Sequence, residues 1–306
     1  MKKYITVRVI KAALTILFVW CLVFFLARLT GDPVEWMLSN TATLAAKEQL
    51  RHNLGLDLPL WEQFWRATTG IFRGDAGNSY YYVRPVIDLF AERIRATLSL
   101  GGLVFCVSIL VGVPLGVIAA VKHNSPLDRA IMGVAVAGYT IPNFVFGILL
   151  IFIFSLNLRL LPSGNYGTPA HYILPVISMA VGPTASISRI TRSALLDVIR
   201  QDYLDCARAK GVREWVVILK HALRNALIPV ITIMGAQLST LIGGSVVVET
   251  VFAWPGIGTL IVKSAQNRDF PVVQYGVLLI CASVTLVNLL VDISYAFLDP
   301  RIRDNF

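Results

Sequence analysis

Long apolar stretches alternate with shorter polar ones along most of the chain, a pattern typical of a protein that crosses a membrane several times. A bilayer core requires about 20 apolar residues in a helix. Stretches that are long enough, or nearly so, lie near residues 12–29, 97–120, 130–156, 173–187, 226–248 and 272–291. The fourth is short, so we expect its helix to extend past Ser188 or to be partly shielded by its neighbours. The pattern therefore predicts an all-α polytopic membrane protein with about six transmembrane helices.

The composition supports this interpretation. Hydrophobic residues make up 56% of the 306 residues and the mean hydropathy is +0.69, which is too apolar for a soluble globular protein. The first apolar run is too long for a signal peptide, and no small-x-small cleavage site follows Phe25. We therefore expect an uncleaved first span and a single transmembrane domain over residues 1–306.

Charge sets the expected orientation. Lys and Arg are denser in residues 1–11, 122–129, 189–224 and 298–306 than in the segments between the other spans. Because cytoplasmic loops of membrane proteins carry an excess of these residues, both termini and the 189–224 loop are expected in the cytoplasm. Residues 30–95 then form the longest external region. The net charge of +9 is a topology signal and requires no nucleic acid partner.

The polar stretch from residue 201 to residue 211 organises the chain. Two acids, Asp202 and Asp205, come first and two bases, Arg208 and Lys210, come last, which is the order that complements a helix dipole. A glycine just past the last turn can take the left-handed conformation that ends a helix. We therefore predict a helix of about two turns that ends at Gly211.

The residues that follow predict a second helix, which completes a hairpin over residues 189–225. Its polar side carries Arg213, Lys220, His221 and Arg224. Its predicted apolar face consists of Val212, Trp215, Val216, Leu219, Ala222 and Leu223. Charge alone is equally consistent with a solvated basic loop.

The amino-acid sequence of this hairpin resembles that of a known family. Ala-Arg-Ala-Lys-Gly at residues 207–211, followed by His-Ala-Leu-Arg-Asn-Ala-Leu-Ile-Pro at residues 221–229, resembles the EAA loop of permease subunits of ATP-binding-cassette (ABC) importers. Asp205 stands for the glutamate that names the loop and Cys206 for its first alanine, as in peptide and nickel permeases. Residues 249–258 and 267–274 resemble the same subfamily most specifically, so the resemblance covers nearly the whole chain.

The resemblance implies the type I ABC importer (MetI-like) permease fold and a non-catalytic subunit. The implied partners are cytoplasmic ATP-binding subunits, a second permease that is usually a paralogue, an external substrate-binding protein and membrane lipid. No cofactor is expected in this chain, because ATP and Mg would bind the partner subunits. The implied location is the bacterial cytoplasmic (inner) membrane. The implied coupling residues that contact the ATPase are Asp202, Asp205, Ala207, Arg208, Ala209, Lys210 and Gly211.

The resemblance favours di- or oligopeptides as cargo, with nickel or a metal chelate as the alternative. A stand-alone secondary transporter or channel is a hypothesis of a different class. Coupling to ions would require acids in mid-membrane, and the predicted spans contain only Asp292, near one end. We therefore expect a structural role for Asp292.

Polar residues inside two spans are candidates for a translocation pathway. The third span contains a predicted helix break near Pro142, and the fifth carries several polar groups that must face protein or water. The candidates are Thr140, Asn143, Gln237, Ser239 and Thr240. Hydrogen bonding between helices is the alternative role for the polar groups of the fifth span.

Other chemistry is missing from the sequence. There is no phosphate-binding Gly-x-x-x-x-Gly-Lys-Ser/Thr loop, no His-Glu-x-x-His and no Gly-x-Ser-x-Gly. The four histidines lie on different loops, so no metal site is expected, and the four cysteines offer no external pair for a disulfide. We interpret the cysteines as packing residues. We also expect residues 249–258 to form an external turn at the membrane surface, followed by a short amphipathic helix, and residues 30–95 to be a packed cap or a contact for the binding protein.

Overall fold

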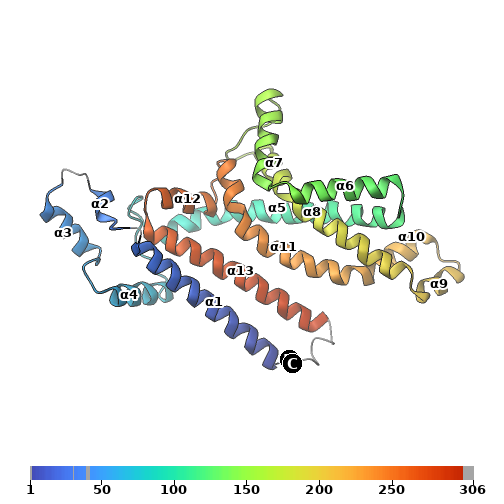
Figure 1. Ribbon diagram of the computed structural model, residues 1–306, viewed down its shortest axis with the longest axis horizontal. Helices are drawn as coiled ribbons and strands as arrows, with labels where there is room; N and C mark the ends of the chain where they lie inside the picture. The colour runs from blue at the N-terminus through green and yellow to red at the C-terminus, as the bar shows by residue number, and fades with distance from the viewer. Residues whose placement is uncertain (1, 30, 39–41, 299–306) are drawn as a thin grey trace.

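The computed structural model describes residues 2–29, 31–38 and 42–298, and among these it is helical with no β-strand (Figure 1). The chain termini beyond these ranges, on which part of the predicted topology depends, lie outside the described residues. The long helices are α1 (Lys2–Leu29), α5 (Val86–Val121), α6 (Pro126–Thr140), α8 (Pro169–Ile199), α11 (Leu223–Val251) and α13 (Phe270–Leu298). The shorter ones are α2 (Val34–Met37), α3 (Leu44–Asn53), α4 (Leu60–Phe72), α7 (Asn143–Leu150), η1 (Ile151–Asn157), α9 (Asp202–Ala209), α10 (Glu214–Val216), η2 (Val217–Ala222) and α12 (Ile257–Gln266).

Five of the described helices are long and apolar enough to cross a membrane, and a bent pair makes a possible sixth. The bent pair is α6 with α7 and η1, which turn by 102°. The predicted break near Pro142 is therefore confirmed. Proline disfavours a helical conformation in the residue before it, and Ile141 is accordingly extended, with ψ of 124°.

The fourth span lies at the centre of the bundle. Its helix, α8, continues past Ser188 to Ile199 as expected. Within its most apolar segment, 61% of the residues are buried inside the chain. Two glycines let α5 approach it closely. A Cβ on Gly112 would lie 2.9 Å from the side chain of Ile187, and one on Gly116 would lie 2.5 Å from the carbonyl oxygen of Ser188. Close packing through small residues is a common way to join helices in a membrane.

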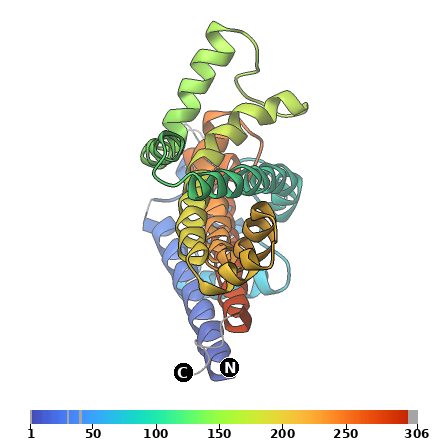
Figure 2. The ribbon, with the colours of Figure 1, turned by 90° about the vertical axis from the view of Figure 1, so that its right-hand side faces the viewer.

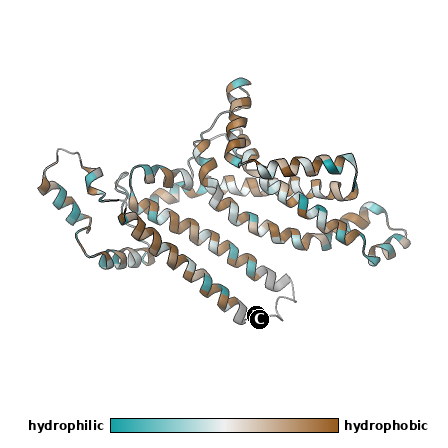
Figure 3. Ribbon diagram, in the orientation of Figure 1, coloured by the Kyte–Doolittle hydropathy of each residue, from teal (hydrophilic) through white to brown (hydrophobic). Residues whose placement is uncertain are grey.

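Helices α1 and α13 run side by side along one edge of the molecule (Figures 1 and 2). Figure 3 shows that both are mostly hydrophobic, and little of either span is buried within the chain. Arg8 and Asp292 form an ion pair of 2.9 Å between them. The acid in the last span thus joins two helices, which fits the structural role expected for it.

The turn after α11 is packed into the protein. Phe252 and Trp254 are fully buried within the chain, and the indole of Trp254 donates to the carbonyl oxygen of Ala96 at 3.0 Å. Glu249 is also fully buried inside α11 and accepts hydrogen bonds from the Thr97 hydroxyl at 2.8 Å and from the Gly258 amide at 2.7 Å. The turn therefore fastens α11 to α5 and α12. The predicted short amphipathic helix is confirmed as α12.

Helices α2, α3 and α4 lie at the end of the molecule opposite α9 (Figure 1). Helix α4 packs on the second half of α1, where the Trp20 indole donates to the Thr68 hydroxyl at 2.9 Å. The segment before α5 is held by buried Asp269, which accepts hydrogen bonds from the Ser79 hydroxyl and the Tyr80 amide at 2.5 Å and 3.0 Å. This region is tied to α1 and α13 by contacts between distant parts of the chain.

Candidate functional site

Helix α9 has the length and the end predicted from its sequence. It spans eight residues, about two turns, and Gly211 follows it with φ of +77°. The Gly211 amide donates to the carbonyl oxygen of Arg208 at 2.9 Å, and the Val212 amide donates to that of Ala207 at 3.3 Å. These two bonds form a Schellman motif, in which a left-handed residue satisfies the last carbonyl groups of the helix. The chain therefore reverses sharply into the second half of the hairpin.

Arg208 holds the two halves of this hairpin together. Its guanidinium donates to Asp205 at 2.7 Å and to both carboxylate oxygens of Glu214, at 3.1 Å and 3.0 Å. The hydrogen bonds to the two acids raise the pKa of Arg208, and those from Arg208 lower the pKa of Glu214. The bidentate geometry fixes the orientation of α9 relative to α10.

One fully buried residue of α9 packs into the bundle. Leu204 is fully buried, whereas Asp202, Asp205, Cys206, Ala209, Lys210 and Gly211 are exposed and Ala207 and Arg208 are partly buried. Leu204 belongs to a buried hydrophobic cluster that includes residues at the ends of α5, α8 and α11 and in η2. The members are Ala120, Leu195, Val198, Leu204, Val217, Ala222 and Ala226. A displacement of α9 would therefore reach three long helices through this cluster.

The predicted apolar face of the second half is partly wrong. Val217 and Ala222 are fully buried, but Trp215 is 61% exposed and Leu219 is 52% exposed. The reason is the π-helical segment η2, whose wider turns change which side chains share a face. Two apolar side chains are thus left on the outer surface of the hairpin.

Three of the five predicted pathway residues converge on one cavity. Asn143, Gln237 and Thr240 line a space of about 180 Å³ between α7, α8 and α11. Its wall is completed by Tyr139, Met179, Gly182, Pro183, Ser186 and Leu241. The arrangement places an amide from each of two helices beside the break in the third span.

The other two candidates do not join this cavity. The Thr140 hydroxyl donates to the Val136 carbonyl oxygen of its own helix at 2.8 Å. The Ser239 hydroxyl donates to the side-chain oxygen of Asn288 at 2.7 Å, so Ser239 joins α11 to α13. Hydrogen bonding within and between helices, the alternative considered for the fifth span, accounts for both residues.

Sequence reasoning missed a buried ion pair near the α9 end of the bundle. Asp128, on α6, is 2% exposed, and both of its carboxylate oxygens accept hydrogen bonds from Arg192 of α8, at 2.6 Å and 2.7 Å. Arg192 also borders a second cavity of about 270 Å³ that shares Tyr139 and Ser186 with the first. The Ser125-x-x-Asp128 spacing, which marks a helix start, was the available signal.

Among the described residues no three His, Cys, Asp or Glu side chains lie close enough together to hold a metal ion. The described cysteines are all free. Cys106 and Cys206 are exposed in this chain, so packing accounts at most for the partly buried Cys21 and Cys281.

Comparisons with protein families give matches along the whole chain. The model of the binding-protein-dependent transport system inner membrane component matches residues 112–304. The model of the N-terminal part of the binding-protein-dependent transport system membrane component matches residues 1–101. The first match begins and the second ends within α5, so the region around α2–α4 and the helices after it both lie in segments shared with known families.

Curated relatives match at full length. The chain is 44% identical over 304 residues to the glutathione transport system permease protein GsiC of Pectobacterium atrosepticum, covering 99% of each chain. It is 43% identical over 304 residues to GsiC of Escherichia coli K12, again covering 99% of each.

Solved structures share the fold. Two crystal forms of the MetNI methionine ABC transporter in inward-facing conformations match with TM-scores of 0.56 and 0.59 at 20% identity. They cover 70% and 69% of this chain and 97% and 96% of theirs.

Proposed function

The chain belongs to the family of inner-membrane components of binding-protein-dependent transport systems, and from this membership we propose that it is the permease for glutathione or a related small peptide. It is a non-catalytic, multi-pass subunit of an ABC importer, in which other subunits hydrolyse ATP. The observation that carries the cargo proposal is the identity of 44% to a glutathione permease over 99% of both chains. Nickel or a metal chelate is the alternative cargo from the same family.

We propose that α9 is the coupling helix, which seats on a cytoplasmic ATPase subunit. Several features support this role. The outer surface of α9 is exposed, the Arg208 bonds make the hairpin rigid, and Leu204 passes any displacement to α5, α8 and α11. ATP binding that closed the ATPase subunits would move α9 and thereby switch the bundle between inward and outward access. ATP and Mg would be bound by those subunits.

The cavity lined by Asn143, Gln237 and Thr240 is our proposal for part of the translocation pathway. Amide and hydroxyl groups can exchange hydrogen bonds with the peptide groups of a cargo without binding it so tightly that release becomes slow. Helix α7 leaves the bundle nearly at right angles, and Phe144, Ile148 and Phe152 on α7 and η1 are exposed. This apolar arm supports a second permease subunit as a partner that completes the pathway.

The proposed orientation places the termini and α9 in the cytoplasm and α2–α4 outside. The density of Lys and Arg supports it, as does the position of α9 and α2–α4 at opposite ends of the molecule (Figure 1). The substrate-binding protein would then dock near α2–α4.

The test is ATP hydrolysis by the complete complex in lipid, with its ATPase subunits, partner permease and binding protein. We expect binding protein loaded with glutathione to stimulate hydrolysis and binding protein mixed with a nickel chelate to leave it at the basal rate. Stimulation by the nickel chelate alone would overturn the peptide proposal. Transport without any ATPase subunit would instead identify a stand-alone transporter.

A further inference from the structure

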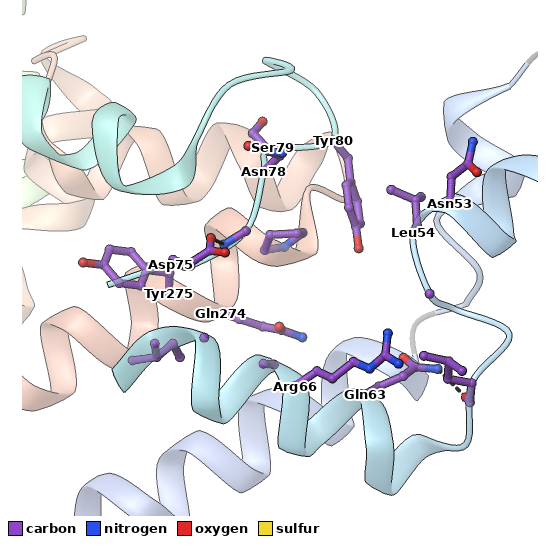
Figure 4. A pocket seen from close by; sticks show the side chains of 18 of the residues that line it. Asn53, Leu54, Gln63, Arg66, Asp75, Asn78, Ser79, Tyr80, Gln274 and Tyr275 are labelled. Atoms are coloured by element: carbon purple, nitrogen blue, oxygen red, sulfur yellow. Dashed lines mark hydrogen bonds between the residues drawn. The ribbon is translucent and has the colours of Figure 1, made fainter. Parts of the chain in front are cut away.

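A cavity larger than the proposed pathway lies at the opposite end of the molecule from α9. Its volume is about 660 Å³, within the range of small-ligand sites. Parts of the chain that are far apart in sequence form its wall, namely α1, α3, α4, the segment before α5 and the start of α13. Figure 4 shows polar side chains from several of these elements directed toward a common space.

Gln274 marks this cavity as a binding site. Its side chain is 6% exposed, and its amide nitrogen has no hydrogen-bond partner among the described residues. In Figure 4 the amide points from α13 into the cavity, toward Gln63 and Arg66 on α4. A buried donor left without an acceptor costs about 1–3 kcal/mol, so this amide calls for an acceptor, which a bound ligand or an ordered water can supply.

Other donors surround the same space. The Arg28 guanidinium donates only to the neutral side-chain oxygen of Gln63, at 3.3 Å and 3.2 Å, and lies 4.0 Å from the centre of the Phe24 ring. No carboxylate of the described part of the chain lies within ion-pair distance of it. Tyr80 also lines the cavity, and burial raises its pKa, so its hydroxyl stays protonated and able to donate.

Acids are scarce in this wall. Arg66 also lines the cavity and is only partly neutralised, through one bond of 2.8 Å to Glu62. Asp75 is the one acid among the described residues that line the cavity, and one of its oxygens already accepts from the Gly77 amide at 2.8 Å. The wall therefore offers cations and neutral donors in excess of acceptors, which suits a carboxylate.

We propose that this cavity binds a small peptide-like solute through its carboxylate. Gln274 and Tyr80 would donate hydrogen bonds to the carboxylate, Arg28 and Arg66 would supply positive charge, and Asp75 would attract the ammonium group. The inference rests on the proposed function in that the solute is of the same class as the cargo. The site would hold cargo before it enters the Gln237 cavity.

The experiment measures equilibrium binding of radiolabelled glutathione to the complex in lipid nanodiscs without its binding protein. We expect Gln274→Leu to raise the Kd about tenfold, the effect of losing one hydrogen bond to a charged group, and Tyr80→Phe to raise it several-fold. Gln266→Leu, on the exposed end of α12, is the matched control and should bind like the wild type. The diethyl ester of glutathione, which lacks free carboxylates, should bind at least tenfold more weakly.

Thermal unfolding separates a binding defect from a folding defect. Gln274→Leu removes an unpartnered buried amide, so its Tm without ligand should equal or exceed that of the wild type. Glutathione should raise the Tm of the wild type but not that of the variant.

Several results would overturn the site. These are unchanged binding in Gln274→Leu, equal binding of the ester and the free acid, no binding to the wild type, or a loss of binding in Gln237→Leu but not in Gln274→Leu. If one of these results is found while loaded binding protein still stimulates ATP hydrolysis, the site is wrong and the cargo proposal stands. If binding depends on Gln274 but no stimulation occurs, the site stands and the cargo proposal falls.

Discussion

The two ends of the molecule are held in place by different kinds of contact. At the α9 end, Arg208 bonds residues three and six positions away in sequence. At the α2–α4 end, the Trp20 indole bonds Thr68, 48 positions away, and the Ser79 hydroxyl bonds Asp269, 190 positions away. Helices α9 and α10 are thus held to each other by residues close in sequence, whereas the α2–α4 end is held by residues far apart in sequence.

This difference fits the proposed roles of the two ends. A coupling element must move as a rigid piece against several helices, and α9, whose ion pairs are local and whose Leu204 packs among three long helices, can do so. A binding cavity must keep donors from distant segments in fixed positions, and long-range bonds to α1 and α13 provide that. Each prediction below changes one end, and the two largest use the other end as their control.

The largest effect is expected at Gly211. Gly211 and Gly74 both have φ of +77°, and at neither would an added Cβ meet an atom within 4 Å, so aspartate causes the same backbone strain at both. We expect Gly211→Asp to lower recovery of the ATPase subunits at least tenfold in a detergent pull-down, and Gly74→Asp to leave it unchanged. Full recovery with Gly211→Asp would refute the coupling role of this loop.

A second effect is expected in stability at the α2–α4 end. Asp269→Ala removes a buried acceptor from the Ser79 hydroxyl and the Tyr80 and Tyr81 amides, which should cost about 3 kcal/mol. Asp205→Ala removes an exposed acceptor from the α9 hairpin and should cost less than about 1 kcal/mol. Thermal unfolding in detergent compares the two variants. Equal losses would show that the ends do not differ as we describe.

A smaller effect is expected from the bond between Trp20 and Thr68. We expect Thr68→Val to destabilise the protein by about 1 kcal/mol more than Thr69→Val, because it removes the bond from the Trp20 indole as well as the bond from the Thr68 hydroxyl to the Phe64 carbonyl oxygen of its own helix. The control is Thr69→Val, since the hydroxyl of Thr69 bonds only its own helix. If both variants unfold at the same temperature, the long-range bond contributes nothing beyond helix propensity.

The smallest effect is expected from pH at the α9 hairpin. Arg208 lowers the pKa of Glu214, so their bond stabilises the hairpin above the ordinary glutamate pKa of 4.5 and is lost as pH falls through the lowered value. Trp215 is the adjacent, exposed reporter. We expect its fluorine signal, after labelling with fluorotryptophan, to shift in acid below about pH 4.5. The shift should be absent in Glu214→Gln, and its persistence there would assign it to another group.

Local signals explain which features could be predicted from the sequence. Gly211 marks the end of α9, and this boundary agrees with the structure. The break at Pro142 could also be predicted from the sequence. Its angle of 102° could not, because that angle depends on how α7 packs. The sequence around Trp254 is aromatic and rich in turn residues, which suggested a membrane surface, yet its contacts with α5 bury it.

The candidate sites were harder to predict, because they depend on contacts between distant residues. Polar residues within the predicted spans indicated Asn143, Gln237 and Thr240 as candidates. Only the structure shows that the three line one cavity. Gln274 carried no signal in its sequence context, since an unpartnered amide can be recognised only once its surroundings are known.

The most direct test of the account uses the native Cys206, which lies exposed on α9. Its rate of labelling by a water-soluble maleimide would be measured in nanodiscs with and without the ATPase subunits, with a cysteine introduced at position 74 as the reference. The account predicts that the ATPase subunits slow labelling of Cys206 strongly and leave position 74 unaffected. Equal labelling of Cys206 in the assembled complex and in the permease alone would contradict the assignment of α9 as the coupling helix.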